Sequence, residues 1–98
     1  MAFQIRFSPE VREHLKSLSR REQQIVLDEV SKQLQNEPGV PTRNRKRLRP
    51  NPLAPWELRV GDLRVLYDIG DLEQRVDVLV IGRKVREKLL VAGKEVKL

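Results

Sequence analysis

The sequence contains no cysteine and a single histidine, His14. Without cysteine the chain has no disulfide framework, no thiolate metal site and no thiol nucleophile, and one histidine does not make a metal cluster. Aromatic residues are also few, with two Phe, one Trp and one Tyr. We therefore expect a core of Val, Leu and Ile, and neither a metal nor a small-molecule cofactor.

Long hydrophobic runs are absent as well. No run reaches the length of about eighteen apolar residues that a bilayer-spanning helix needs. The first residues, MAFQIRF, lack the apolar segment of a signal peptide. We expect a cytoplasmic protein that makes no contact with a membrane.

Positive charge prevails in what is present. Twenty Lys and Arg residues against fourteen Asp and Glu give a formal net charge of +6 and a pI near 10.2. This balance favours a polyanion or an acidic protein as partner, and nucleic acid is the more common of the two. A chain of 98 residues predicts one domain that spans residues 1–98.

The N-terminal residues predict a strand followed by a helix. Apolar and polar side chains alternate in residues 3–7, FQIRF, with the two-residue period of a half-buried strand. Ser8 then suits a helix N-cap, Pro9 the first helical position and Glu10 the positive end of the helix dipole. We expect a first amphipathic helix from Ser8 to Leu18.

A second helix is predicted directly afterwards. Ser19 and Glu22 have the spacing of a capping box, and Asn36, Pro38 and Gly39 end the helix. Two helices with a short break form an antiparallel hairpin that buries its apolar stripe on a sheet. The stripe of the second helix consists of Val26, Val30 and Leu34, widened by Ile25 and Leu27.

A long basic connection separates the helices from the rest of the chain. Residues 38–55 hold five of the six prolines, which excludes regular helix and central strand. Long ordered loops are often functional. The connection carries a dense basic cluster made of Arg43, Arg45, Lys46, Arg47 and Arg49.

The remaining residues predict β structure. Residues 56–60 alternate as a strand, Gly61-Asp62 gives a turn into a second strand over 63–69, and the apolar run 76–82 suits a central strand. A short C-terminal helix is expected over Val85 to Val91. The fold class is therefore α+β: an N-terminal strand, an antiparallel helical hairpin packed on a mainly antiparallel four-stranded sheet, and a short C-terminal helix.

Two motifs follow each other along the chain, namely Phe7-Ser8-Pro9 and Arg59-x-Gly61-Asp62-x-Arg64-Val65-x-Tyr67. Together and in this order they resemble the RelE/ParE toxin superfamily of toxin-antitoxin systems, and the resemblance covers essentially the whole chain. The resemblance implies a RelE-like fold and an antitoxin partner. The RelE branch is known for cutting mRNA in the ribosomal decoding site, and the ParE branch for inhibiting DNA gyrase.

The resemblance also implies a site. Arg64 matches the arginine that contacts the scissile phosphate in the ribonuclease members. RNA cleavage without a metal needs a base, an acid and positive charge for the phosphorane. Further basic residues lie where neighbours of the site are expected, namely Arg59, Arg83, Lys84 and Arg86.

The acid and the base depart from the family pattern. RelE-type enzymes place lysines where this chain reads Pro55-Trp56-Glu57, and a tyrosine where it reads Leu89-Leu90. Tyr67 matches a structural residue. Glu57 can act as the base instead, with Lys46 or Lys84 nearby. The predicted catalytic set is therefore Arg64, Arg59, Glu57 and Lys84.

Structural interpretations of the same residues stay open. Glu57 and Arg59 on the solvent face of a strand also suit cross-strand charge partners, and Trp56 suits a hairpin anchor. The basic cluster is a solvated loop, a contact for RNA phosphates, or a surface for an acidic antitoxin segment. The predicted RNA-binding or antitoxin-binding residues are Arg43, Arg45, Lys46, Arg47, Arg49, Arg83 and Arg86.

Three functions follow from the resemblance. The first is a toxin that cuts mRNA on the ribosome, inhibits translation and is neutralised by a cognate antitoxin. The second is a ParE-like inhibitor of DNA gyrase, which explains the missing acid and base. The third is a catalytically degenerate RelE-like protein kept for partner binding or co-repression.

Overall fold

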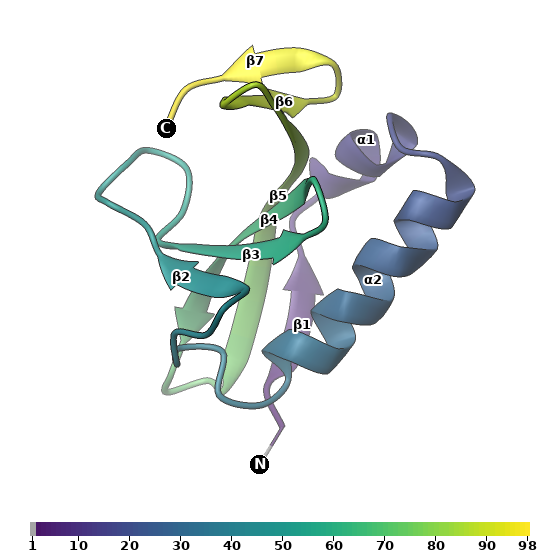
Figure 1. Ribbon diagram of the computed structural model, residues 1–98. Coiled ribbons are helices and arrows are strands. Elements are labelled where there is room, and N and C mark those ends of the chain that lie inside the picture. Colours follow the sequence, from purple (N-terminus) through teal and green to yellow (C-terminus); the bar gives the residue numbers. More distant parts are fainter. Residues whose placement is uncertain (1) are drawn as a thin grey trace.

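The structure is a computed structural model that describes residues 2–98, and it confirms the α+β fold class (Figure 1). Two helices follow the first strand, and six further strands follow the helices. The elements are β1 Gln4–Phe7, α1 Val11–Lys16, α2 Arg20–Leu34, β2 Arg45–Arg47, β3 Trp56–Val60, β4 Leu63–Gly70, β5 Arg75–Val85, β6 Lys88–Val91 and β7 Lys94–Val96.

One seven-stranded sheet holds all of these strands. Its order is β2-β3-β4-β5-β6-β7, and β1 pairs with β5 outside this path. β1 is parallel to β5, whereas every other pair is antiparallel. β1 and β6 share one edge of β5 because β1 pairs with residues 75–78 and β6 with residues 83–85. The mainly antiparallel sheet is confirmed, but the prediction of four strands was wrong.

The predicted C-terminal helix is also wrong. Residues 85–91 form the end of β5, a tight turn and β6. Arg86 and Glu87 at this turn have φ angles of 48° and 68°. Two successive positive φ angles are the backbone of a type I′ hairpin turn, whose twist matches that of the flanking strands. The turn therefore sends the chain back along β5 instead of into a helix.

Burial along β6 shows why a strand is favoured there. Leu89 and Val91 are buried, whereas Lys88 is exposed and Leu90 is only partly buried. This alternation is the two-residue period of a strand with one covered face. A second hairpin turn, at residues 92–93, leads into β7 with positive φ angles at both positions.

The second predicted helix is confirmed as α2. The Ser19 hydroxyl accepts a hydrogen bond from the Glu22 N–H, and the Glu22 carboxylate accepts one from the Ser19 N–H. This is the reciprocal capping box that the sequence indicates. The stripe is buried as predicted at Val26, Val30 and Leu34, whereas Ile25 is 43% exposed.

The first helix is shorter than predicted. α1 begins only at Val11, and its N-cap position is Glu10, which makes no side-chain cap. Ser8 instead serves the sheet, because its hydroxyl donates to the carbonyl of Leu79 at 3.3 Å and its N–H donates to the carbonyl of Val78 at 2.9 Å. Ser8 therefore fixes the end of β1 on β5.

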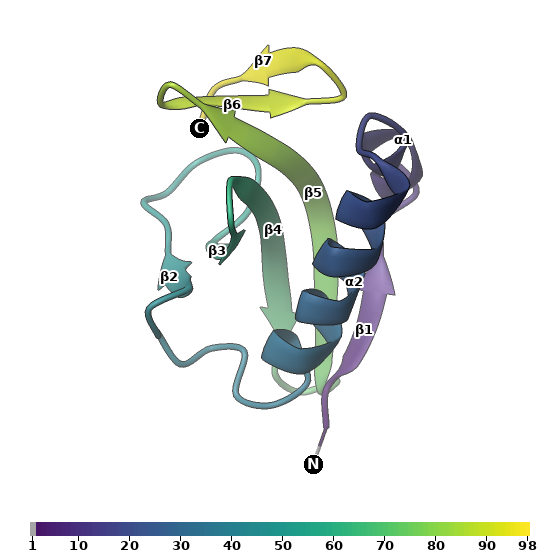
Figure 2. The same cartoon turned by 45° about the vertical axis from the view of Figure 1, so that its right-hand side comes forward.

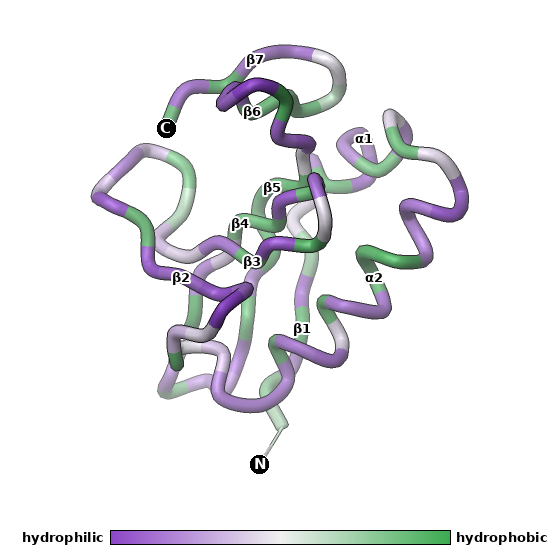
Figure 3. The backbone as a smooth tube through the Cα atoms, in the orientation of Figure 1, coloured by the Kyte–Doolittle hydropathy of each residue, from purple (hydrophilic) through white to green (hydrophobic). Residues whose placement is uncertain are grey.

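Apolar side chains cover both faces of the sheet. On one face, α1 and α2 pack over the central strands around buried residues that include Val30, Leu58 and Tyr67. On the other face, Leu66 and Val80 lie under residues of β6 and of the loop before β3. Figure 2 shows α2 lying along one side of the sheet and the β6–β7 hairpin turned across its end. In Figure 3 the hydrophobic colour follows β4 and β5, and the hydrophilic colour is strong at β2.

Neither helix within residues 2–98 has the length and hydrophobicity needed to cross a membrane.

Candidate functional site

The candidate site lies on the face of the sheet opposite the helices, beside the turn that joins β3 to β4. Pairing of the strands places Lys46, Glu57 and Leu66 in one row across β2, β3 and β4. Arg59 of β3 and Arg64 of β4 are partners in the next row. Directly opposite residues of an antiparallel pair share a face. The fold thus brings three residues of the predicted catalytic set together with Lys46.

Glu57 is the buried centre of this arrangement. Only 5% of the residue is exposed, so the prediction that it lies on a solvent face is wrong. Its Oε1 atom lies 3.9 Å from Nζ of Lys46 and 3.9 Å from Nε of Arg64. A buried carboxylate needs such positive neighbours, because leaving an isolated charge out of water is costly. Glu57 is therefore held between two cations.

Arg64 is held in place by the turn before it. Its Nη1 atom donates to the carbonyls of Gly61 and Leu63, at 2.9 Å each, and 11% of its side chain is exposed. Arg59, its partner across the strands, is exposed. None of the ion pairs within residues 2–98 includes Arg59. The two arginines therefore form a like-charged pair with one fixed and one uncompensated member.

β5 supplies the far side of the site. Gly82 is the partner of Arg64, and a Cβ atom on Gly82 would meet the carbonyl oxygen of Leu90 at 2.6 Å. Glycine is needed there because the backbone of β6 approaches so closely. Lys84 follows two residues later, on the same face. Glu57 and Lys84 thus lie on opposite sides of Arg64.

Comparison with known proteins identifies the family. The profile described as "ParE toxin of type II toxin-antitoxin system, parDE" matches residues 5–87. The chain belongs to this ParE toxin family. It is a toxin of a type II toxin-antitoxin system of the RelE/ParE class.

Two solved structures are similar to this toxin. The RelBE2 toxin-antitoxin complex of Mycobacterium tuberculosis contains a chain that is 28% identical, with a TM-score of 0.74 over 85% of this chain and 92% of that chain. The archaeal RelE-RelB complex of Pyrococcus horikoshii OT3 gives 22% identity and a TM-score of 0.69 over 88% and 99%. The second likeness shows the fold alone. No curated protein sequence matches the toxin significantly.

One member of the toxin's basic cluster is buried. Arg45 is 8% exposed, and its Nη1 atom donates to the carbonyls of Gln33 at 2.6 Å and Asn36 at 3.2 Å. Those carbonyls lie at the C-terminal end of α2, where a cation also interacts favourably with the helix dipole. Arg45 thus caps the end of α2, on the face of the sheet opposite the candidate site. The other four residues of the basic cluster are exposed, namely Arg43, Lys46, Arg47 and Arg49.

The other two predicted binding residues differ in their surroundings. Arg83 donates through Nη1 to Asp62 at 2.8 Å and through Nη2 to Glu22, so both ends of its guanidinium are occupied. Its side chain projects from the face of the sheet on which the helices pack. Arg86 lies exposed at the β5–β6 turn. Of the two, Arg86 is the one whose cation takes part in none of the ion pairs found among residues 2–98.

The aromatic residues of this toxin support the hairpin from behind. Trp56 is 6% exposed and stacks on Tyr67 with ring centroids 6.1 Å apart, and the Arg47 guanidinium lies 5.9 Å from the Trp56 ring centroid. The Tyr67 hydroxyl donates to the carbonyl of Pro38 at 2.8 Å. Burial raises the pKa of Tyr67 to about 12. The tyrosine therefore keeps its proton and acts as a structural residue.

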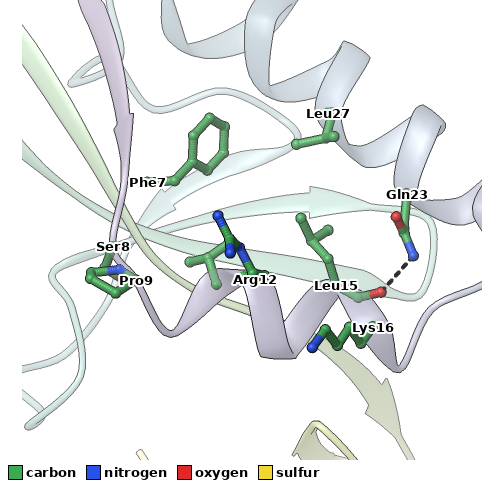
Figure 4. A pocket seen from close by; sticks show the side chains of 9 residues that line it. Phe7, Ser8, Pro9, Arg12, Leu15, Lys16, Gln23 and Leu27 are labelled. Carbon is green, nitrogen blue, oxygen red and sulfur yellow. Dashed lines mark hydrogen bonds between the residues drawn. The ribbon is translucent and has the colours of Figure 1, made fainter.

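An apolar hollow between β1 and the helices was missed from the sequence. Figure 4 shows Phe7, Leu15 and Leu27 converging on it, with Arg12 at its rim. A second hollow shares Phe7 and Leu27 and continues along β1 and α2. The sequence did not reveal the hollow because Phe7 lies on the apolar side of the alternating pattern 3–7 and was expected to be in the core. In the structure Phe7 is 45% exposed.

Proposed function

We propose that this toxin is an endoribonuclease that cuts ribosome-bound mRNA, inhibits translation and is neutralised by a cognate antitoxin. The proposal joins the RelE/ParE resemblance with the site on the face of β3 and β4 that lies opposite the helices. The similar chain of known structure belongs to a RelBE2 toxin-antitoxin complex. The geometry supplies the chemical part of the argument.

The pairing of Arg59 with Arg64 carries the proposal. Like charges directly opposite each other across two strands destabilise a sheet. Arg59 and Arg64 hold these positions, beside the additional cation Lys46. A phosphate between the two guanidinium groups would remove the repulsion and accept charge-assisted hydrogen bonds. A phosphate-binding role therefore accounts for a pair that has an unfavourable effect on the fold.

The groups around the arginines suit transfer of the proton and the phosphoryl group. In the proposed step, Glu57 takes the proton of the 2′-hydroxyl, and the resulting alkoxide attacks the adjacent phosphorus. Arg59 and Arg64 stabilise the charge of the phosphorane. Lys84, on the other side of Arg64, gives a proton to the leaving 5′-oxygen. Base and acid on opposite sides of the phosphate fit an in-line displacement.

Antitoxin binding has two candidate surfaces on this toxin. One is the exposed part of the basic cluster, which suits an acidic segment and would block the approach of RNA. The other is the apolar hollow beside β1. The edge of β1 that faces away from β5 pairs with no strand within residues 2–98. An unpaired edge accepts an added strand from a partner. An antitoxin that used both surfaces would cover substrate-binding charge and apolar surface together.

The test is cleavage of mRNA by purified toxin in the presence of ribosomes, followed by primer extension. Wild-type protein is expected to create new mRNA ends. Glu57→Gln keeps the side-chain shape and is expected to lower the cleavage rate by about 10²-fold or more, with RNA binding retained. Glu73→Gln changes an exposed glutamate far from the site and serves as the matched control. Absence of new ends with folded wild-type toxin and active ribosomes would exclude the nuclease.

Gyrase inhibition is the second candidate function. The observation in its favour is that the only tyrosine is buried and bonded to Pro38, so the site lacks the tyrosine of RelE-type enzymes. The matching family profile is also named for ParE. A supercoiling assay with purified gyrase discriminates between the functions. Inhibition of supercoiling with intact mRNA would replace the nuclease function by gyrase inhibition.

A further inference from the structure

We infer that Arg83 is a positioning residue that clamps the β3–β4 turn to the start of α2 and thereby fixes the guanidinium of Arg64. The inference rests on the proposed function only in so far as Arg64 binds phosphate. The sequence placed Arg83 among the residues that contact a ligand. In the structure Arg83 instead supports Arg64, the residue proposed to contact the ligand.

The fork of Arg83 joins two parts of the chain that are far apart in sequence. Nη1 donates to Oδ2 of Asp62 at 2.8 Å, and Nη2 donates to Oε2 of Glu22. Asp62 is the second residue of the turn, and Glu22 lies in the first turn of α2. A guanidinium holds its five N–H donors in a rigid plane and can bond two carboxylates from different nitrogens, whereas a lysine has a single nitrogen. The side chain therefore bridges the hairpin turn and the helix.

Glu22 is well prepared for this contact. Its Oε1 atom accepts the N–H of Ser19 at 3.0 Å in the capping box, so Oε2 is free to accept from Arg83. The hydrogen bond from Arg83, followed by that from the Ser19 backbone, lowers the pKa of Glu22. The same bond, followed by the one to Asp62, raises the pKa of Arg83. The ion pair between Glu22 and Arg83 therefore stays charged at neutral pH.

The position of the turn then determines the position of the Arg64 side chain. Both hydrogen bonds that hold Nη1 of Arg64 end on turn carbonyls, those of Gly61 and Leu63. Gly61 has a φ of +60° and is exposed, so the turn has little packing of its own. A second hold comes from the backbone, where the Lys84 N–H donates to the Asp62 carbonyl at 2.8 Å. A shift of the turn would move both acceptors of Arg64.

The two faces of the sheet separate the support from the site. Arg83 is the partner of Leu63, whereas Arg64 is the partner of Gly82, so their side chains leave opposite faces. Arg83 consequently positions Arg64 without reaching a ligand bound there. A change at Arg83 should act on the order of Arg64 and on phosphate affinity, with the charge of the site itself unchanged.

The direct test is NMR relaxation of the Arg64 Nε–H group in the toxin without ligand. Arg83→Gln should increase the mobility of this group and speed hydrogen exchange of the turn amides. Arg75→Gln is the matched control, because Arg75 is also an arginine of β5 paired with a carboxylate, that of Asp77. The control should leave Arg64 unchanged. Arg83→Lys should restore order only in part, since an ammonium group does not bridge both carboxylates.

Affinity gives the second readout. A short 2′-O-methyl RNA, which resists cleavage, is titrated against each variant by fluorescence anisotropy. Arg83→Gln is expected to weaken binding at least about fivefold, a coupling typical of linked sites. Glu22→Gln and Asp62→Asn each remove one arm of the clamp and should give intermediate losses. Gln at position 22 also preserves the capping box, so α2 stays intact.

The outcomes separate this inference from the proposed function. An Arg64 Nε–H that is as ordered in Arg83→Gln as in wild type overturns the inference. Should Arg83→Gln fail to fold, the mobility of Arg64 is measured in Glu22→Gln and Asp62→Asn, and an unchanged Arg64 there overturns it equally. A mobile Arg64 in these variants, together with a wild type that neither binds nor cuts RNA, supports the clamp and rejects the nuclease.

Discussion

Arg59 and Arg64 are direct partners across β3 and β4, and the side chains of both leave the face opposite the helices. Hydrogen bonds from Nη1 to the Gly61 and Leu63 carbonyls hold the Arg64 side chain at the turn. Like charges directly opposite each other are unfavourable for folding, and Glu57 offsets the charge of Arg64 but not that of Arg59. Stability and binding should therefore respond to Arg59 in opposite directions.

We expect Arg59→Gln to raise the free energy of unfolding while it weakens RNA binding. Removal of one like charge should stabilise the sheet by a few tenths of a kcal/mol, about the size of a cross-strand pair. Urea unfolding at low salt measures the gain, which should shrink at high salt as the repulsion is screened. Arg43→Gln, in an exposed loop position, is the control that should not show the gain. A destabilised Arg59→Gln protein would mean that Arg59 makes favourable contacts within the fold.

Arg64→Ala should abolish toxicity without loss of the fold. One well-placed donor typically contributes about 3 kcal/mol to stabilisation of the transition state, so cleavage should fall by more than about a hundredfold. Induced expression in a bacterial host, with pulse-labelled protein synthesis and primer extension on an abundant mRNA, measures the effect. Arrest by wild type with new mRNA ends, and neither in the variant, is the expected result. Equal arrest by both proteins would remove Arg64 from the site.

Arg45→Gln tests whether Arg45 stabilises the fold, while the exposed residues of the basic cluster bind RNA. Loss of the bonds to Gln33 and Asn36 should lower the free energy of unfolding by roughly 1.5–3 kcal/mol, because bonds from charged donors are the stronger ones. RNA affinity should stay close to that of the wild type. The matched change Arg49→Gln, at an exposed position, should weaken RNA binding and leave stability unchanged. Reversed effects in the two variants would return Arg45 to the binding surface.

Local signals in the sequence predicted much of this fold. The capping box of Ser19 and Glu22 involves residues three apart, so its geometry is set within one helical turn. The Gly61-Asp62 turn and the apolar run of β5 are equally local. The family motif around Arg64 likewise points to one short hairpin. These features need no knowledge of what packs against them.

Distant contacts account for the errors. Ser8 has the sequence of a helix cap, but its hydroxyl bonds to Leu79, which is 71 residues away. Arg45 belongs to a basic cluster, yet its role depends on the end of α2 lying beside β2. Residues 85–91 have a composition that suits a helix, but the sheet offers β5 as a partner strand. Burial of Glu57 likewise depends on two neighbouring strands.

His14 bonds to the edge of β5 in the gap between the segments that pair with β1 and with β6. Its Nδ1 atom accepts a hydrogen bond from the Ile81 N–H at 3.3 Å, which requires Nδ1 without a proton. Burial lowers the pKa of His14 below its ordinary value of 6.5, and the charge of Glu10 opposes this only in part.

The direction of the pH effect follows from this shift. A histidine with a lowered pKa in the folded state binds fewer protons there than in the unfolded state, so stability is lost as pH falls below 6.5. Thermal unfolding between pH 6.5 and about 5.5 measures the loss while carboxylates of ordinary pKa stay largely ionised. His14→Asn offers an oxygen acceptor to Ile81 without a titrating group and should flatten the profile. An equally steep profile in His14→Asn would assign the loss to other groups, whereas a flat one would show that the bond of His14 to β5 depends on its neutral form.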